Sequence, residues 1–205
     1  MANLDLRFDA YTEEFSGRSL AELRSYALTN PIDGPVSIEI GANRGKFLVD
    51  LAEINPDRRY LGIELRLSFA RAAASLGKRR GCKNADTIHA DANLAIPVLI
   101  DDGQLEEMFL LYPDPWWKAK HHKRRMIQPD FLDLLAKKMP SGGKVWIRTD
   151  VGPLADDMRS TLNDHADFEP LKLDEYPLMP FPWTNREVHC FERGLPAHLV
   201  YFRRI

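Results

Sequence analysis

The chain has 205 residues and a formal net charge of −2, and 44% of its residues are hydrophobic and 28% charged. This profile is typical of a soluble globular protein with one domain, and it excludes a membrane protein, because no apolar run approaches the roughly 20 residues of a membrane span. The small net charge gives no global indication of a nucleic-acid partner, which must be inferred from how the charges are distributed.

The cysteines and the N-terminus predict a cytoplasmic protein. Cys82 and Cys190 are the only cysteines, they are far apart, and no CxxC motif is present. We therefore expect reduced thiols rather than a disulfide. The first fifteen residues are acidic and polar, without the basic start and apolar segment of a signal peptide.

From residue 36 onward, short β-rich apolar runs alternate with amphipathic windows of helical spacing, which predicts βα units and a parallel sheet. In chain order, the expected elements are a strand at 36–40, a helix from 47 that stops at 55–56, a strand at 60–64, a helix at 69–76, a strand at 87–89, a helix at 92–100, a strand at 108–111, a helix around 131–135, a strand at 144–149, a helix at 154–162 and a strand at 199–202. Prolines 177, 180 and 182 predict a loop before the last strand. The fold class is thus α/β and Rossmann-like, with a mostly parallel central sheet flanked by helices and a C-terminal antiparallel hairpin.

The domain organisation follows from this pattern. Residues 36–205 form one predicted domain, and residues 1–35 form an N-terminal extension. Within the extension, residues 20–28 are compatible with a helix that packs over the site, and the first dozen residues are expected to be mobile.

Three acidic residues lie at or beside the carboxyl ends of predicted strands, where open α/β sheets bind their ligands. Glu39 precedes the turn that starts at Gly41, Glu64 ends the second strand, and Asp91 follows the third. These carboxylates suit a nucleoside that carries an amine, such as S-adenosylmethionine. They suit NAD less well, because the turn reads G-x-x-x-G instead of G-x-G-x-x-G. Ordinary carboxylates at a sheet edge are the alternative interpretation.

The sequence LYPDPWWKAKHHKRR follows the fourth predicted strand, at residues 111–125. Two prolines flank Asp114 and restrict its backbone. Trp116 and Trp117 could stack on a base or simply pack in the core. The basic residues after them resemble a footprint for a phosphate backbone, although a solvated face is the alternative. Adjacent histidines rarely both bind one metal, so no metal site is predicted.

This loop is the strongest part of a resemblance to the bacterial tRNA (guanine-N7-)-methyltransferase family of class I S-adenosylmethionine-dependent enzymes. The family loop reads roughly [FL]-x-P-D-P-W-x-K-x-[RK]-H-x-K-R-R, and residues 111–125 match nearly every fixed position. The resemblance continues through the T-D pair that ends with Asp150 and the T-x-x-E element from Thr184 to Glu187.

The resemblance implies a cytoplasmic enzyme that methylates N7 of a guanosine in the variable loop of tRNA. Its partners would be tRNA and S-adenosylmethionine, with no metal and no membrane, and the protein would be a monomer or a homodimer. Asp114 would be the catalytic residue. The implied cofactor residues are Glu39, Gly41, Glu64, Asp91 and Asp114. The implied substrate and tRNA residues are Lys118, Lys120, His121, His122, Lys123, Arg124, Arg125, Asp150, Thr184, Arg186 and Glu187.

Two departures from the family pattern leave alternatives open. Asn43 occupies the middle glycine position of the first turn, where a residue with positive φ is expected. Asn185 and Arg186 replace a basic residue followed by an aromatic one. A methyltransferase of the same fold with another RNA or a small molecule as substrate is therefore one alternative. A non-catalytic RNA-binding relative is the other.

Overall fold

The computed structural model describes residues 17–171 and 181–205. Its helices are α2 (Leu20–Thr29), α3 (Lys46–Ile54), α4 (Leu67–Arg79), α5 (Ala92–Leu99), α6 (Pro129–Lys138), α7 (Gly152–Asn163) and α8 (Asn185–Glu192), with a 3-10 helix η1 at Ala119–Arg124. Its strands are β1 (Val36–Ile40), β2 (Arg59–Glu64), β3 (Ala85–His89), β4 (Leu105–Leu111), β5 (Lys144–Thr149), β6 (Phe168–Pro170) and β7 (His198–Arg204).

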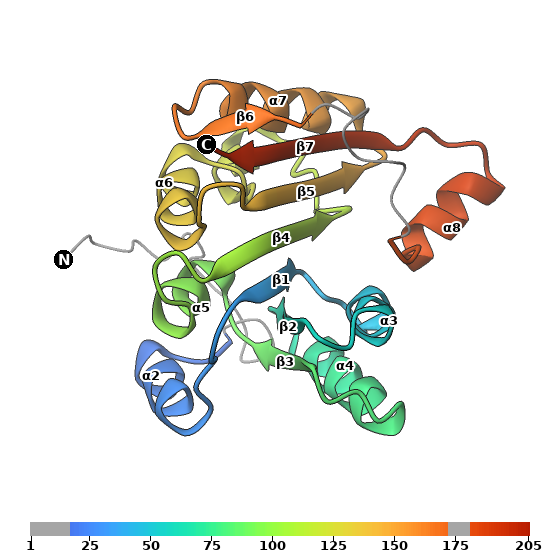
Figure 1. The fold of residues 1–205 in the computed structure, drawn as a ribbon. Coiled ribbons are helices and arrows are strands. Elements are labelled where there is room, and N and C mark those ends of the chain that lie inside the picture. Colours follow the sequence, from blue (N-terminus) through green and yellow to red (C-terminus); the bar gives the residue numbers. More distant parts are fainter. Residues whose placement is uncertain (1–16, 172–180) are drawn as a thin grey trace.

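Within these residues the strands form one sheet in the order β3-β2-β1-β4-β5-β7-β6 (Figure 1). Strands β1 to β5 are parallel, and β7 runs antiparallel to both β5 and β6. The chain order reverses between β1 and β4, so a crevice opens at the carboxyl ends of these two strands. The predicted α/β class, the mostly parallel sheet and the C-terminal antiparallel pair are confirmed, although α8 lies between β6 and β7 in the chain.

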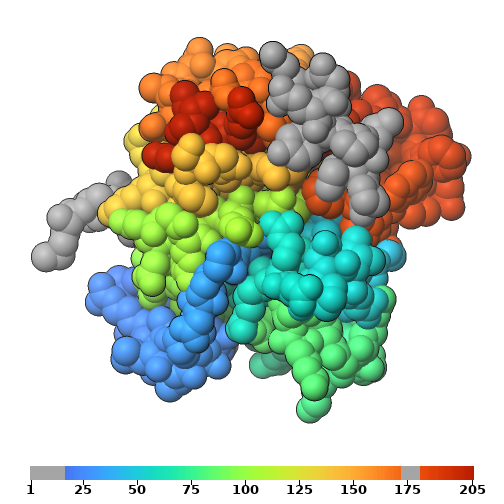
Figure 2. All heavy atoms as spheres, viewed as in Figure 1, coloured from blue at the N-terminus to red at the C-terminus, as the bar shows by residue number. Residues whose placement is uncertain are grey.

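Two hydrophobic layers cover the sheet, because successive side chains of a strand point to opposite faces. On one face Ile38 of β1 and Met108 of β4 pack with α2, α5, α6 and α7. On the other face Phe109 and Trp146 pack with α3 and with Phe181. Figure 1 shows α2, α5 and α6 on one side of the sheet and α3, α4 and α8 on the other, and Figure 2 shows orange-red α8 on the same side as the cyan region.

The turn between β1 and α3 depends on glycine. Gly45 has a φ of +78°, and a Cβ atom added there would lie 2.7 Å from the Cβ and 2.9 Å from the Cα of Ala73 on α4. Glycine therefore permits both the left-handed backbone and the close approach of α3 to α4. The same turn contains Asn43, whose φ of 51° confirms that asparagine adopts the left-handed conformation expected at that position.

Every predicted strand is present, and three described elements were missed, the first being the 3-10 helix η1 in the basic segment. The other two are the short strand β6 and the helix α8, which lie on either side of the proline-rich stretch predicted as a loop; Pro177 and Pro180 of that stretch lie outside the described residues. The predicted helix at 20–28 is α2, but it packs against α5 and none of its residues lines either cavity described below. The first dozen residues, predicted to be mobile, also lie outside the described part of the chain.

Candidate active site

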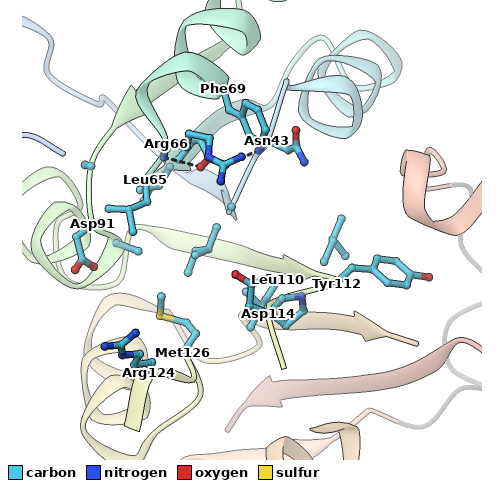
Figure 3. Close-up of a pocket in the computed structure, with 18 of the residues that line it drawn as sticks. Asn43, Leu65, Arg66, Phe69, Asp91, Leu110, Tyr112, Asp114, Arg124 and Met126 are labelled. Carbon is cyan, nitrogen blue, oxygen red and sulfur yellow. Dashed lines mark hydrogen bonds between the residues drawn. The ribbon is translucent and has the colours of Figure 1, made fainter. Parts of the chain in front are cut away.

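A cavity of about 390 Å³ opens at the carboxyl ends of β1, β2 and β4 (Figure 3). We call it the first cavity. Its walls come from the β1 turn, the ends of β2 and β3, and the loop after β4. The residues that line it are Ile40, Gly41, Asn43, Ile63, Glu64, Leu65, Arg66, Phe69, Ala90, Asp91, Ala92, Leu110, Leu111, Tyr112, Pro113, Asp114, Trp116, Arg124 and Met126.

Glu64 is fixed at the centre of one wall by two backbone hydrogen bonds. Its Oε2 accepts from the Asn43 N–H at 2.7 Å, and its Oε1 accepts from the Arg66 N–H at 2.8 Å. The residue is 8% exposed. Each oxygen keeps a second lone pair, so the group can still accept two hydroxyl donors from a ligand in the cavity.

Glu39 lies behind the β1 turn with one unsatisfied carboxylate oxygen. It is 4% exposed, and its Oε2 has no hydrogen-bond partner among the described residues. Burial, with a smaller contribution from the negative charge of Glu64, raises its pKa to about 8, against a hydrogen bond from the Leu48 backbone that lowers it. A buried carboxylate oxygen without a partner is costly, so this position favours a cationic donor.

Asp91 has a structural role as well as a place in the cavity wall. It is the N-cap of α5, where its Oδ1 accepts from the backbone N–H of Asn93 at 2.9 Å and from the Asn93 side-chain amide at 3.0 Å. N-capping uses only one carboxylate oxygen. The other oxygen therefore remains able to accept a hydrogen bond from a ligand.

The loop after β4 carries backbone strain on both sides of Asp114. Tyr112 and Trp116 have φ values of 52° and 47°, in the left-handed region that costs a non-glycine residue about 1–3 kcal/mol. The Tyr112 N–H donates to the Arg148 carbonyl at 2.7 Å, which ties the start of the loop to β5. Burial raises the pKa of the Tyr112 hydroxyl well above its ordinary value, so this group stays neutral.

A second cavity of about 570 Å³ adjoins the first. Its walls are the β1 turn, the loop after β4, the end of β5 and the start of α8. Its lining residues are Glu39, Gly41, Ala42, Asn43, Arg44, Lys46, Phe47, Leu111, Tyr112, Pro113, Asp114, Pro115, Trp117, Asp150, Val151, Thr184, Asn185 and Arg186. Asp114 lines both cavities, is exposed, and accepts no hydrogen bond from the described residues. Its carboxylate is therefore free to act where the two cavities meet.

The comparisons with known proteins agree with this arrangement. A family model described as "Putative methyltransferase" matches residues 33–197. Over 171 residues the chain is 32% identical to a tRNA (guanine-N(7)-)-methyltransferase of Thermosynechococcus vestitus, covering 83% of this chain and 80% of that protein. It is 40% identical over 173 residues to the Haemophilus influenzae protein of the same name, covering 83% and 70%. The chain belongs to the tRNA (guanine-N(7)-)-methyltransferase family.

Solved structures show the same fold at low identity. The precorrin-6y C5,15-methyltransferase of Geobacter metallireducens superposes with a TM-score of 0.56 at 16% identity, covering 95% of this chain and 93% of that one. At this identity the likeness concerns the fold alone. It confirms the predicted Rossmann-like methyltransferase fold for this member of the tRNA (guanine-N(7)-)-methyltransferase family.

The basic residues of the family loop form two groups. The lysines are exposed, and the arginines already have contacts within the protein. Lys118, Lys120 and Lys123 are exposed to solvent. Arg125 is not: its Nε donates to the Pro115 carbonyl at 3.1 Å and its Nη1 pairs with Asp157 at 2.9 Å. The guanidinium carbon of Arg124 lies 5.0 Å from the Trp116 ring centre. The sequence pattern alone does not separate these two groups.

The histidines of the loop lie at the edge of this packing. His121 contacts Trp116, with ring centres 5.9 Å apart, and both histidines are partly exposed. Partial desolvation lowers the pKa of His121, and the positive charge of Arg124 lowers it further, so the ring is neutral at pH 7. No group of three or more candidate metal ligands occurs in residues 17–171 and 181–205. In the same ranges no helix has the length and apolar character to cross a membrane.

The T-x-x-E element of the family is a helix cap here. Thr184 is the N-cap of α8, and its Oγ1 accepts from the Glu187 N–H at 3.0 Å while the Glu187 carboxylate accepts from the Thr184 N–H at 2.7 Å. The Glu187 carboxylate also pairs with Arg148 of β5. One helix position earlier, Arg186 pairs with Asp150. These contacts hold the first turn of α8 against the second cavity.

Sequence reasoning missed Arg148 entirely. This arginine is 8% exposed, and its Nε donates to the Tyr201 hydroxyl at 2.9 Å. A charged residue inside the apolar run 144–149 was the available signal, because a buried charge needs a partner. The partners lie far along the chain, so only the folded structure identifies them.

Proposed function

We propose that this protein transfers the methyl group of S-adenosylmethionine to N7 of a guanosine in tRNA, in the variable loop. Membership of the tRNA (guanine-N(7)-)-methyltransferase family supports the reaction class. The observation that carries the assignment to this site is the position of Asp114, which lines the first and the second cavity and has no partner among the described residues.

The first cavity fits S-adenosylmethionine, which when bound supplies an electrophilic methyl group on a sulfonium. The methionine part would extend past the β1 turn into the second cavity, where the unpartnered Oε2 of buried Glu39 suits its ammonium. Glu64, held by two backbone N–H groups, keeps lone pairs for the two ribose hydroxyls. The second oxygen of Asp91 suits the adenine amino group. The left-handed backbone of Asn43 lets its N–H orient Glu64, so the departure from the family glycine is compatible with this role.

The second cavity suits the guanine base. N7 of guanine already carries an unprotonated lone pair, so the enzyme needs no general base to make it nucleophilic. Asp114 can accept hydrogen bonds from N1–H and N2–H₂, which fixes the base relative to the first cavity. The negative charge of Asp114 also favours the positive charge that the purine acquires when N7 is methylated.

The remaining lining residues of the second cavity suit the sugar and phosphates of the target nucleotide. Arg186 is 47% exposed at its side chain while it pairs with Asp150, so guanidinium N–H groups remain available to a phosphate. Thr184 and Glu187 act through the helix cap that places Arg186. The target base has to leave the stacked RNA to reach this cavity, as in other enzymes that modify bases.

The tRNA backbone contacts are assigned to the exposed lysines. Lys118, Lys120 and Lys123 lie next to the loop that carries Asp114 and project into solvent. Arg125 supports the loop through Pro115 and Asp157, so we assign it a bracing role beside any contact with phosphate. This distribution gives a basic surface beside the active site in a chain whose net charge is −2.

The test is methyl transfer from labelled S-adenosylmethionine to an unmodified tRNA transcript, followed by mass spectrometry of the nucleosides. We expect 7-methylguanosine as the product. Incorporation into another nucleoside, another RNA or a small molecule would replace the proposed substrate. Calorimetry that detects no binding of S-adenosylmethionine would instead indicate a non-catalytic RNA-binding relative.

A further inference from the structure

Two tryptophans on the rim of the second cavity are exposed to solvent. Trp117, from the loop after β4, lines the cavity and is 69% exposed. Trp183 is 49% exposed and directly precedes Thr184, which lines the same cavity. Neither ring is part of the hydrophobic core. Trp116 differs, because it packs with Arg124 and His121 beside the first cavity. These contacts give the Trp116 ring a packing role, whereas the rings of Trp117 and Trp183 remain exposed.

Trp183 is held in place although it is exposed. Lys46 Nζ donates to its carbonyl oxygen at 3.3 Å, which connects the α8 segment to the start of α3. Its ring meets the ring of Phe191 with centres 5.3 Å apart and planes inclined by 68°. Phe191 is itself 73% exposed. Figure 1 shows α8 beyond the end of the sheet toward which β1 and β4 point, on the side where the second cavity opens.

The rim of the second cavity carries cations beside the carboxylates of Glu39, Asp114 and Asp150, and one of these cations, Lys46, is paired with Asp50. Arg44 and Lys46 line the second cavity, and Lys118 follows Trp117 in the exposed part of the loop. Arg44 packs over the Phe69 ring at 4.8 Å and has no carboxylate partner in the described chain. Exposed aromatic rings interleaved with cations are typical of surfaces that bind single-stranded nucleic acid, where bases stack on the rings and phosphates meet the cations.

We propose that the nucleotides next to the target guanosine stack on Trp117 and on the Trp183–Phe191 pair while that guanosine occupies the second cavity. This inference rests on the proposed function. It states which side chains hold the RNA while the target guanosine is out of the base stack. When the target guanosine leaves the RNA stack, each flanking base loses a stacking contact. Stacking on a tryptophan ring replaces that contact. Trp117 stands at a variable position of the family loop, so this contact is a property of the present sequence.

A second copy of the chain is the other occupant to consider for the apolar face of α8, which also includes Val188 and continues with Leu195 after the helix. The first turn of α8 forms a wall of the second cavity through Thr184 and Arg186. A protein seated on this face would cover the approach to that cavity. The location at the cavity rim and the surrounding cations therefore favour RNA.

The experiment measures the Kd of an unmodified tRNA transcript with S-adenosylhomocysteine present, for wild type, Trp117→Ala and Trp183→Ala. Each alanine variant should raise Kd by roughly 5- to 150-fold, the range that the loss of one base–aromatic stack produces. Trp117→Phe should restore most of the affinity, because phenylalanine retains a stacking face. The slope of log Kd against log salt should stay at the wild-type value, because no charge is removed.

Leu28→Ala is the matched control, since Leu28 is 86% exposed on α2 and lines neither cavity. It should leave Kd unchanged. Wild-type affinity in both tryptophan variants would overturn the inference. So would a change in sedimentation from dimer to monomer in Trp183→Ala with an unchanged Kd, because that result assigns the face to a second copy. Methyl transfer by the wild type is measured in parallel, so failure of the proposed function is recognised separately.

Discussion

The guanidinium of Arg148 on β5 pairs with the carboxylate of Glu187 on α8, and the two side chains are only 9% and 13% exposed. Arg148 also donates to the Tyr201 hydroxyl, and Glu187 also accepts from the Thr184 N–H. This pair connects the end of the central sheet to the helix whose first turn forms a wall of the second cavity. The substrate side of the site therefore depends on a largely buried charge pair.

Replacing Glu187 by glutamine should destabilise the protein strongly. The change leaves the Arg148 guanidinium without its counter-charge, which costs about 3 kcal/mol in the free energy of unfolding. Urea denaturation measures this loss. The double variant Arg148→Met with Glu187→Gln should lose less than the sum of the two single variants, because no uncompensated charge remains. Strictly additive losses would show that the two side chains do not depend on each other.

Glu39→Gln should make the free protein less sensitive to pH. With a pKa of about 8 in the folded state against 4.5 as the ordinary value, Glu39 holds a proton that the unfolded chain has released between these pH values. Stability therefore falls as pH rises from about 4.5 to 8, and the glutamine variant should lose this decline. Thermal unfolding from pH 5 to 9 checks the result. Equal pH dependence in both proteins would contradict the raised pKa of this buried carboxyl group.

The same residue predicts proton release when S-adenosylmethionine binds. A ligand ammonium beside Glu39 favours the ionised carboxylate, so binding at pH 7 should expel a proton and tighten as pH approaches 8. Calorimetry in two buffers with different ionisation enthalpies counts that proton. Glu39→Gln should bind more weakly and release none. Proton release that persists in the variant would assign the titration to another group.

Removing the exposed charges of the loop should act on tRNA affinity. In Lys120→Gln with Lys123→Gln, the slope of log Kd against log salt should fall by about 2, one unit for each lost phosphate contact. Arg125→Gln should behave differently. Because Arg125 holds Pro115 and Asp157, its loss should lower kcat even at saturating tRNA. An unchanged salt slope in the lysine variant would show that these lysines are only a solvated face.

Asn43→Gly tests the departure from the family turn. Glycine adopts a φ of 51° without strain, so the variant should be as stable as the wild type or slightly more stable, by about 1 kcal/mol or less. Its affinity for S-adenosylmethionine should not change, because the backbone N–H that meets Glu64 is retained. A large loss of affinity would show that the Asn43 side chain itself contacts the ligand.

The sequence predicted the sheet well, because the buried parallel strands are short apolar runs bounded by turns. It missed β6, whose three residues end in Pro170 and pair with one neighbour, since such an edge strand has too little pattern to detect. It missed α8 because the prolines before it suggested a loop. The capping box of Thr184 and Glu187 was visible, but it was interpreted only as a substrate motif.

The acidic residues at the strand ends could be predicted because parallel strands bring their carboxyl ends to one edge. What those residues contact could not. The partner of Arg125 is Asp157, 32 residues away on α7, and the partner of Arg148 is Glu187, 39 residues away. Such pairs depend on how helices pack on the sheet, which local sequence patterns do not encode. Trp116 lines the first cavity and Trp117 lines the second. The local sequence does not show this difference, and the backbone at Trp116 is in the left-handed region.

In the proposed reaction, Asp114 presents N7 of a tRNA guanine to the first cavity. The most direct test compares methyl incorporation into a tRNA transcript and into the same transcript with 7-deazaguanosine at the target position, for wild type and Asp114→Asn. We predict incorporation by the wild type into the first transcript only, and a loss of at least about 100-fold in Asp114→Asn with normal unfolding behaviour. Equal methylation of the 7-deaza transcript, or near-normal activity of the Asp114 variant, would contradict the claim.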